Sequence, residues 1–145
     1  MMKKIGSVIS LSFMVLIFIM AANAHGGEWI LLGENDRGSF LYDKTSISKT
    51  NDGMIIVDWK SIFSADAAKE FEEFSPTLKG VSFVLYHDLI NCHKRTYESK
   101  GVQYYNKEVK LIYDSKTNES KYKPIGIRPI PHDTPIERLA DIVCK

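Results

Sequence analysis

Short runs of alternating apolar and polar residues fill most of the chain, and turn signals separate them. The first two runs are residues 28–32 and 39–43, with a polar stretch from Gly33 to Gly38 between them. Residues 54–63 show the clearest alternation, which has the two-residue period of a strand. The faces of this strand are expected to carry Ile55, Val57, Trp59 and Phe63 on one side and Asp58 and Lys60 on the other. A sheet with one covered and one wetter face is typically antiparallel.

Four further strands are predicted in the second half of the chain. They span residues 81–90, 95–105, 108–113 and 122–127. We expect a bend or bulge near Gly101, because glycine inside a strand often marks such a position. Asn106 and Lys107 separate two runs by two residues, which indicates a hairpin turn. The last strand is expected at an edge, since Pro124 cannot donate to a central ladder, and residues 128–133 form a stiff connector.

The last segment, residues 134–145, has the period of a helix. Thr134 can accept a hydrogen bond from the N–H of Glu137, and Glu137 can reach back to the N–H of Thr134, which together make a capping box. Pro135 fits the first helical position, where its missing N–H is not needed. The apolar stripe of this helix is Ile136, Leu139, Ala140 and Val143. A helix this short is marginal in water by itself, so we expect it to dock on the sheet.

Residues 64–74 also change period, and they predict a short amphipathic helix or an ordered loop with Ser64 as its cap. Pro76 ends this segment, because a proline restricts the residue before it. Strands followed by one terminal helix indicate an α+β fold. We expect one antiparallel sheet of about six strands with the C-terminal helix packed on it. A small barrel or sandwich is the alternative.

The N-terminus has the features of a secretory signal. Two lysines precede an apolar run from Ile5 to Met20, and Ala22-Asn23-Ala24 matches a small-x-small cleavage site. The sequence therefore predicts a signal peptide over residues 1–24 and a single exported domain over residues 25–145. An uncleaved anchor is the alternative, but the run is somewhat short for a membrane span. No later segment is apolar for long enough to span a bilayer.

Export changes the charge balance only slightly. Cleavage removes two of the 19 basic residues and none of the 18 acidic ones, so the formal charge passes from +1 to −1. This near-balance, without a dense basic cluster, argues against nucleic-acid binding. A signal peptide indicates the periplasm or the cell surface and does not decide between them.

The chain has two cysteines, Cys92 and Cys144. In an exported protein two cysteines most simply form one disulfide, and two separate buried thiols are the alternative. The bridge would close a loop of about 50 residues, worth on the order of 4 kcal/mol in the chain-entropy treatment. We therefore expect it to hold the C-terminal helix, and its reduction to free that helix.

Catalytic and metal-binding patterns are weak in this sequence. No pair of histidines has the spacing of a zinc motif, so we expect no metal and no other cofactor. A role as a haem or small-ligand carrier would require His87 or His93 beside an apolar pocket. A hydrolase would require Asp43, Asp58 and Asp88 to cluster across the sheet. No nucleophile motif is present, and a non-enzymatic protein is the expectation.

Tyrosines and basic residues are frequent in the second half of the chain, where they would suit an amphipathic binding face. The candidate residues are Lys94, Arg95, Tyr97, Tyr104, Tyr105 and Tyr113. Ordinary strand composition with solvated lysines explains the same pattern, so both interpretations remain.

Several short landmarks follow one another along the chain. They are Trp29, residues 41–47, Val57-Asp58-Trp59, residues 92–97, Tyr105, Pro124-Ile125, Ile130-Pro131, Thr134, Glu137, Leu139 and Cys144. In this order they resemble the bacterial surface-adhesin protein E family over nearly all of the exported chain. The resemblance implies an antiparallel sheet to which a C-terminal helix is tied by a disulfide. The sequence departs from the family pattern at Tyr122, where tryptophan is common, and at Asp133, where glycine is common.

The family takes its name from a surface protein that binds host extracellular-matrix and plasma proteins, so the resemblance implies adhesion. We therefore expect an exported, non-enzymatic binding module whose partners are extracellular proteins. A periplasmic carrier of haem or of another small ligand is the alternative, and homodimerisation through an exposed sheet edge stays open.

Overall fold

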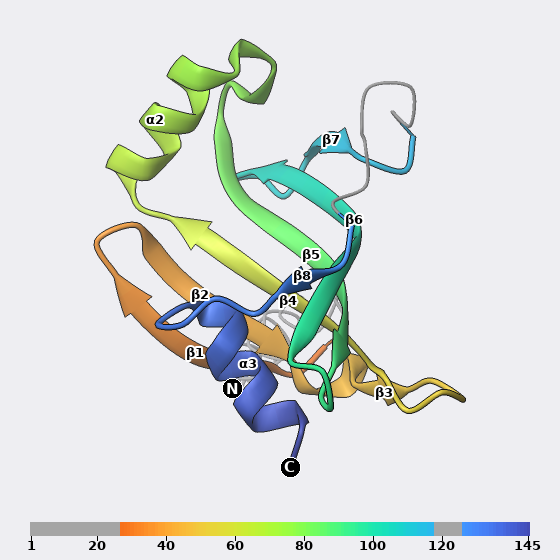
Figure 1. The fold of residues 1–145 in the computed structure, drawn as a ribbon. Coiled ribbons are helices and arrows are strands. Elements are labelled where there is room, and N and C mark those ends of the chain that lie inside the picture. The colour runs from red at the N-terminus through yellow and green to blue at the C-terminus, as the bar shows by residue number, and fades with distance from the viewer. Residues whose placement is uncertain (1–26, 118–125) are drawn as a thin grey trace, which may run out of the picture.

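A strongly twisted antiparallel sheet forms the centre of the molecule (Figure 1). The computed structural model of the chain describes residues 27–117 and 126–145. The predicted signal peptide, residues 1–24, lies outside the described residues. Within those two ranges, no helix is long and apolar enough to cross a membrane.

The sheet has eight strands, of which six follow the order β1-β2-β4-β5-β6-β7, while β3 pairs with β4 and β8 with β6. The strands are β1 (Trp29–Asn35), β2 (Gly38–Asp43), β3 (Ser48–Lys49), β4 (Ile55–Phe63), β5 (Val81–Asn91), β6 (Thr96–Asn106), β7 (Leu111–Asp114) and β8 (Arg128–Pro129). Every paired strand runs antiparallel to its neighbour. The predicted antiparallel sheet of about six strands is therefore confirmed, with two short strands added to it.

Two α-helices lie on the same side of the sheet. The first, α2 (Ala65–Phe74), begins at Ser64, whose hydroxyl accepts a hydrogen bond from the N–H of Ala67 at 3.2 Å. Its Phe71 ring stacks on Phe63 of β4 with ring centroids 4.6 Å apart. The helical alternative for residues 64–74 is thus confirmed. Two single turns of 3₁₀ helix, η1 (Lys44–Ser46) and η2 (Pro76–Leu78), complete the described elements.

The C-terminal helix α3 (Pro135–Val143) packs on the sheet, as predicted. The side chains of Leu139 and Ala140 have no exposed surface, and Ile136 is 6% exposed. The core cluster contains Tyr42, Ile55, Val57, Trp59, Ile90, Ile130, Ile136, Leu139 and Ala140. Burial of this stripe is what stabilises so short a helix, since its intrinsic stability is small.

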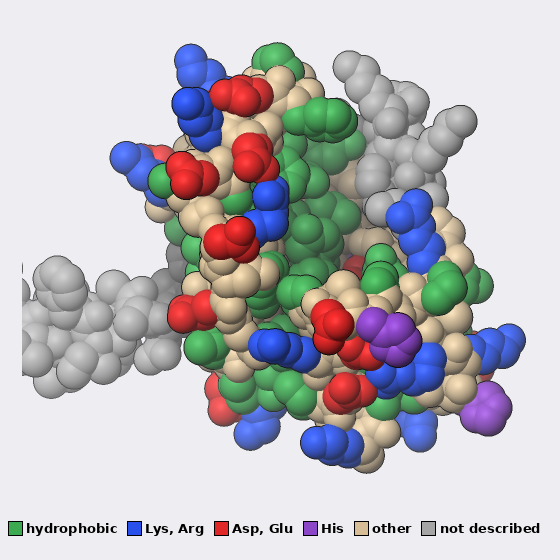
Figure 2. All heavy atoms as spheres, turned by 60° about the vertical axis from the view of Figure 1, so that its left-hand side comes forward, with side chains coloured by type: hydrophobic (Ala, Val, Ile, Leu, Met, Phe, Trp, Pro, Cys, Tyr) green, Lys and Arg blue, Asp and Glu red, His purple; other side chains and the backbone are tan. Residues whose placement is uncertain are grey.

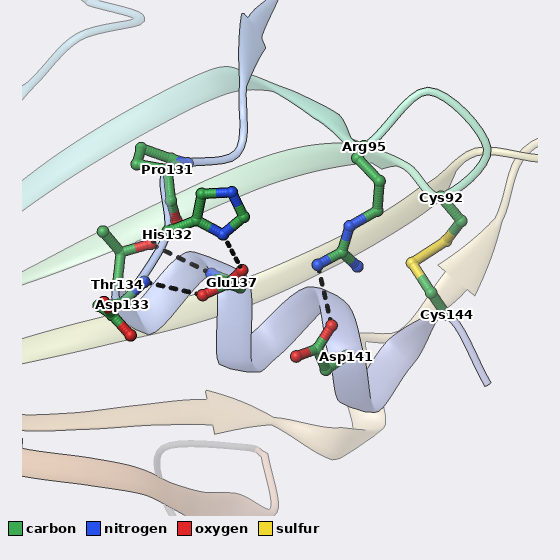
Figure 3. A network of polar contacts seen from close by, with 9 residues as sticks. All are labelled: Cys92, Arg95, Pro131, His132, Asp133, Thr134, Glu137, Asp141 and Cys144. Carbon is green, nitrogen blue, oxygen red and sulfur yellow. Dashed lines mark hydrogen bonds and ion pairs between the residues drawn. A yellow bond between two sulfur atoms is a disulfide. The ribbon is translucent and has the colours of Figure 1, made fainter.

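The start of α3 differs in one bond from the predicted capping box. Thr134 accepts from the N–H of Glu137 at 3.3 Å, as expected. The Glu137 carboxylate, however, accepts from the N–H of Asp133 at 2.8 Å and contacts His132 at 2.9 Å (Figure 3). Asp133 has φ +58°, and this left-handed turn brings its own N–H towards the helix. These hydrogen bonds hold the pKa of Glu137 below its ordinary value.

A disulfide and an ion pair hold the other end of α3 (Figure 3). Cys92, just beyond β5, is bonded to Cys144 at the end of α3, with Cα atoms 5.5 Å apart. Arg95 in the turn between β5 and β6 donates to Asp141 of α3 at 2.9 Å. The predicted bridge between the sheet region and the terminal helix is therefore confirmed.

Two turns are placed differently from their sequence predictions. The polar stretch from Gly33 to Gly38 is mostly strand, because a bulge beside Leu31 lets β1 continue to Asn35. The Asn35 side chain then accepts from the N–H of Arg37 at 2.9 Å and closes a shorter turn. The hairpin after Asn106 is longer than two residues and spans 107–110.

The reason for this longer hairpin is local. The Asn106 side chain accepts from the N–H groups of Glu108 at 3.1 Å and Lys110 at 2.8 Å. Val109 takes a left-handed conformation with φ +61°. An Asn that bonds the backbone ahead of it competes with the strand ladder, so the second strand starts only at Leu111. The bulge predicted near Gly101 is confirmed by a register shift between its pair with His87 and the pair of Ser99 with Asp88.

The predicted edge strand over residues 122–127 lies partly outside the described residues. Its described end, Gly126 and Ile127, is not in a strand. The strand at this place is β8, formed by Arg128 and Pro129, which pair with Tyr97 and Thr96 of β6. Ile130 then donates its N–H to the carbonyl of Arg95 at 3.0 Å. The segment predicted as a connector therefore supplies the pairing.

Because the sheet has helices on one side, its two faces differ. The helix face carries Val57, Trp59 and the other core residues under α3. Figure 2 shows hydrophobic side chains gathered in a hollow next to α2, in the middle of the view. The opposite face, called here the open face, carries the alternate residues of the same strands. No helix within the described ranges packs on it.

Candidate functional site

The open face carries three aromatic rings, from β1, β5 and β6, and a lysine of β4 that lies among them. The ammonium group of Lys60 lies 4.0 Å from the ring centroid of Trp29 and 6.0 Å from that of Phe83. Phe83 stacks on Tyr105 with centroids 4.9 Å apart and an interplanar angle of 10°. We call these four residues the aromatic row.

Lys60 links the rings because its cation is attracted to their faces. Burial among the rings lowers the pKa of Lys60, and the charge of Asp43 opposes this shift. Within the described residues, no carboxylate forms an ion pair with Lys60. Because no described carboxylate lies within ion-pair distance, the Lys60 cation can pair with a carboxylate of a partner.

Large aliphatic side chains flank the aromatic row on the same face. Leu31 is 54% exposed, Ile62 37% and Leu111 45%. Ile62 pairs with Phe83, and Tyr105 pairs with Leu111, so register places these side chains beside the rings. A contiguous patch of exposed apolar side chains often marks an interaction site, whereas single exposed apolar residues are normal on protein surfaces.

A polar hollow of about 200 Å³ adjoins the aromatic row. We call it the polar pocket, and it is lined by Asp58, Leu85, His87, Gly101, Gln103, Asp114 and Lys116. Nδ1 of His87 lies 2.5 Å from the carboxylate of Asp58. The Gln103 amide donates to Asp114 at 2.8 Å, and this hydrogen bond is the main cause that lowers the pKa of Asp114.

The tyrosines predicted as a binding face lie on both sides of the sheet. Tyr105 belongs to the open face and stacks on Phe83. Tyr97 packs against the core cluster of the helix face. Tyr104 faces the same way, with its ring 6.4 Å from Phe71 and 6.0 Å from Tyr113. The tyrosines therefore do not share one surface.

The two basic residues predicted with them lie apart from the rings. Lys94 and Arg95 are exposed in the turn between β5 and β6. Arg95 is engaged by Asp141, so it helps to hold α3. Sequence reasoning missed Trp29, Lys60 and Phe83 as a group, because only the register of the strands brings them together.

Comparison with known families decides the relationship of this chain. A family model described as surface-adhesin protein E matches residues 29–145. The chain belongs to the surface-adhesin protein E family. The match begins at Trp29 in β1 and extends beyond α3, so the resemblance predicted from the ordered landmarks is confirmed. Comparison with curated proteins and with solved structures gives no match.

One departure of this family member from the expected pattern has a structural explanation. Asp133, where the resemblance led us to expect glycine, has φ +58°. Glycine adopts this left-handed conformation without steric cost, and aspartate tolerates it better than most residues do. The other departure, Tyr122, lies outside the described residues.

The three aspartates of the hydrolase hypothesis do not cluster in this adhesin-family fold. Asp43 accepts from the N–H groups of Glu28 at 3.0 Å and Thr45 at 2.9 Å, so it closes a turn. Asp58 lies on the open face beside His87, while Asp88 lies on the helix face, buried under Trp59. The sheet therefore separates Asp88 from Asp58, while the Asp43 carboxylate is engaged in its own turn.

The haem-carrier hypothesis finds no matching geometry in the described residues. His87 is held by Asp58 in a pocket that is mostly polar. His93 is exposed in the turn between β5 and β6. Among the described residues, no three histidine, cysteine, aspartate or glutamate side chains gather where they could hold a metal ion. The expectation of no cofactor stays a prediction.

Asp88 is a buried acid whose charge we expect to destabilise the fold at neutral pH. Burial raises the pKa of Asp88, and the hydrogen bond from the Trp59 indole at 2.7 Å opposes the shift. Because the pKa is raised on folding, its contribution to stability is present below the unfolded pKa of about 3.9 and is lost as the pH rises through the folded pKa.

We expect Asp88→Asn to raise the free energy of unfolding at pH 7 by about 1–3 kcal/mol, the usual cost of an unsatisfied buried group. The variant keeps an acceptor for Trp59 and removes the charge. Urea unfolding at pH 4 and pH 7 measures this effect, which should be smaller at pH 4. Asp52→Asn is the control, since Asp52 is exposed. Destabilisation of Asp88→Asn at pH 7 would contradict the expectation.

Proposed function

We propose that this chain is an exported, non-enzymatic binding module that attaches to extracellular proteins through the open face of its sheet. The observation that carries the proposal is the aromatic row with its exposed aliphatic neighbours. The match to the surface-adhesin protein E family supports a surface-adhesin role and, with it, a place at the cell surface.

The composition of the open face suits a protein partner. Interfaces are enriched in tryptophan, tyrosine and phenylalanine at their centres, and a polar rim surrounds them. Here the rings of Trp29, Phe83 and Tyr105 form the centre. Polar groups lie around them, including the Asp58–His87 pair and the hydrogen bond of Ser39 to Glu34 at 3.0 Å.

The covalent frame of the domain agrees with function outside the cytoplasm. Disulfides form and persist in oxidising compartments, and the described residues hold one disulfide and no free cysteine. The predicted signal peptide over residues 1–24 would deliver the chain there. The same frame holds α3 on the helix face, which leaves the open face for a partner.

Replacing Phe83 by alanine should weaken binding to an extracellular protein ligand by about 30-fold, or about 2 kcal/mol. Phe83 lies between Lys60 and Tyr105, so its loss opens the centre of the aromatic row. Surface plasmon resonance with immobilised matrix and plasma proteins measures the affinity of the exported protein. The substitution Lys60→Met should also weaken binding. The loss of affinity should be larger at low salt than at high salt, because salt screens exposed charges.

Phe74→Ala is the matched control, since Phe74 is 92% exposed and ends α2, which packs on the helix face. It should leave the affinity unchanged. If none of the matrix or plasma proteins binds, or if both phenylalanine variants weaken binding equally, the proposal is wrong. Light scattering on the same samples reports whether the protein is a homodimer.

A further inference from the structure

We propose that the polar pocket binds one neutral sugar ring of a glycan carried by the protein partner. This inference deepens the proposed function, on which it rests for the partner, and it concerns the open face next to the aromatic row.

The neutral form of the His87 imidazole offers an acceptor to the pocket. An ionised carboxylate can only accept, so Nδ1 of His87 carries the proton that is donated to Asp58 at 2.5 Å. In neutral imidazole the other nitrogen, Nε2, is then an acceptor. The carboxylate thus sets both the orientation of the ring and the tautomer that a ligand meets.

A chain of hydrogen bonds orders the other wall. The Tyr105 hydroxyl donates to Oε1 of Gln103 at 3.1 Å, and Nε2 of Gln103 donates to Asp114 at 2.8 Å. Asp114 also accepts from the backbone N–H of Lys116 at 2.8 Å. Tyr105 links the pocket to the aromatic row, because its ring stacks on Phe83 while its hydroxyl donates to Gln103 in the pocket lining. The ligand therefore meets side chains that are already positioned.

The pocket offers donors and acceptors side by side. The Lys116 ammonium group and the second amide proton of Gln103 can only donate, whereas His87 Nε2 and the carboxylate oxygens accept. A hydroxyl group donates one hydrogen bond and accepts others, so a polyhydroxylated ring matches such a mixed lining. Leu85 provides an apolar contact for the C–H groups of the ring.

Charge excludes the simpler ligands. Asp58 and Asp114 would repel a phosphate or sulfate group. Both carboxylates are engaged, by His87 and by Gln103, and Lys116 adds a positive charge, so the pocket is not built for a cation either. A neutral polar ligand remains.

The volume of the polar pocket also favours a small ligand. The hollow of about 200 Å³ is smaller than the 300–1,000 Å³ typical of drug-sized ligands. Its floor is the buried Gly101, where a Cβ atom would lie 3.0 Å from the Cε of Lys116. A hollow of this size suits a single ring, and a methyl group at Gly101 would press on the Lys116 side chain that helps to line it.

The test uses the exported protein with D-galactose, D-mannose, D-glucose and N-acetyl-D-glucosamine as probes. Saturation-transfer NMR and titration followed by chemical shifts should show binding of at least one of these sugars. Gly101→Ala should weaken that binding by about tenfold or more. Gly126→Ala is the matched control, because an added Cβ at Gly126 meets no atom within 4 Å, and it should bind as the unchanged protein does.

Gln103→Leu serves as a second variant that removes the polar group without adding bulk to the floor, and it should also weaken binding by about tenfold. Circular dichroism identifies any variant that fails to fold, and the other variant then decides. Absence of binding by all four sugars, or equal binding by the folded variants, overturns the proposal.

Removal of glycans from a bound matrix protein separates this inference from the proposed function. If the deglycosylated ligand still binds as before and Phe83→Ala still weakens its binding, the sugar site is refuted and the protein-binding function stands. If the sugars bind but no matrix or plasma protein does, the proposed function fails and the sugar site stands.

Discussion

Replacing both Cys92 and Cys144 by alanine is expected to lower the free energy of unfolding by about 4 kcal/mol. The bridge joins positions separated by 52 residues, so it restricts a long loop in the unfolded chain. Net stabilities of small domains are only about 5–15 kcal/mol, so this loss is large. Thermal unfolding followed by circular dichroism should show a decrease of the midpoint on the order of 10–20 °C.

Reduction of the unchanged protein should have a similar effect. The double alanine variant is the control for the reducing agent, because it has no disulfide and its midpoint should not respond. An unchanged midpoint of the natural protein after verified reduction would show that α3 is held without the bridge. The ion pair of Arg95 with Asp141 could not account for the docking of α3 in that case, since exposed ion pairs contribute only about 0–1 kcal/mol.

Replacing Leu139 by alanine is expected to cost about 2–5 kcal/mol of unfolding free energy. Leu139 has no exposed surface and belongs to the core cluster between α3 and the sheet. The substitution removes buried methyl groups and leaves a cavity, and both effects destabilise. Urea unfolding measures the change, and the disulfide keeps the helix close enough for the variant to refold.

Ile142→Ala on the same helix is the matched control. Ile142 is 40% exposed, so the change removes apolar surface that is already partly in water. A loss below about 1 kcal/mol is expected there. If the two variants lose equal stability, the burial of α3 described for the fold is wrong.

These two predictions bear on binding as well as on stability. Trp59 on the helix face stacks on Tyr86 with centroids 4.3 Å apart. The next residue, Lys60, points to the open face and lies over the Trp29 ring. Since β4 carries both contacts on a single backbone, the packing under α3 supports the geometry of the aromatic row on the other side.

Sequence patterns were most informative where the cause of the structure is local. The alternation in β4 placed Val57 and Trp59 on the buried face, because successive strand residues point to opposite sides. The capping residues Ser64 and Thr134 marked the starts of both helices, since a cap bonds to an N–H only a few positions ahead. Patterns of this kind need no knowledge of distant segments.

Turn lengths and edge strands were predicted less well. The Asn106 side chain accepts from the N–H groups of Glu108 and Lys110, a local alternative to the strand ladder that the two-residue spacing did not reveal. The bulge beside Leu31, in contrast, belongs to the pairing of β1 with β2. Register is a property of two strands together, and a shift of one residue exchanges the faces.

The candidate site shows the same division. The sequence named Tyr105 as a binding residue. Tyr105 lies on the open face, so its role in binding stays a prediction. It grouped Tyr105 with Tyr97, Tyr104 and Tyr113, which lie on the helix face. Composition reveals that aromatic residues are frequent, but only the side of the sheet decides which of them a partner can reach.

By itself the sequence determined the fold class, the terminal helix, the single disulfide and the family to which the chain belongs. These properties follow from periodicity, capping residues, two cysteines and an order of landmarks. All of these signals can be read from the order of residues along the chain. The tertiary structure alone decided that Trp29, Lys60, Phe83 and Tyr105 meet, and that a polar hollow lies beside them. Their contacts cross strands far apart in the chain, so strand order and register, rather than any local pattern, bring them together.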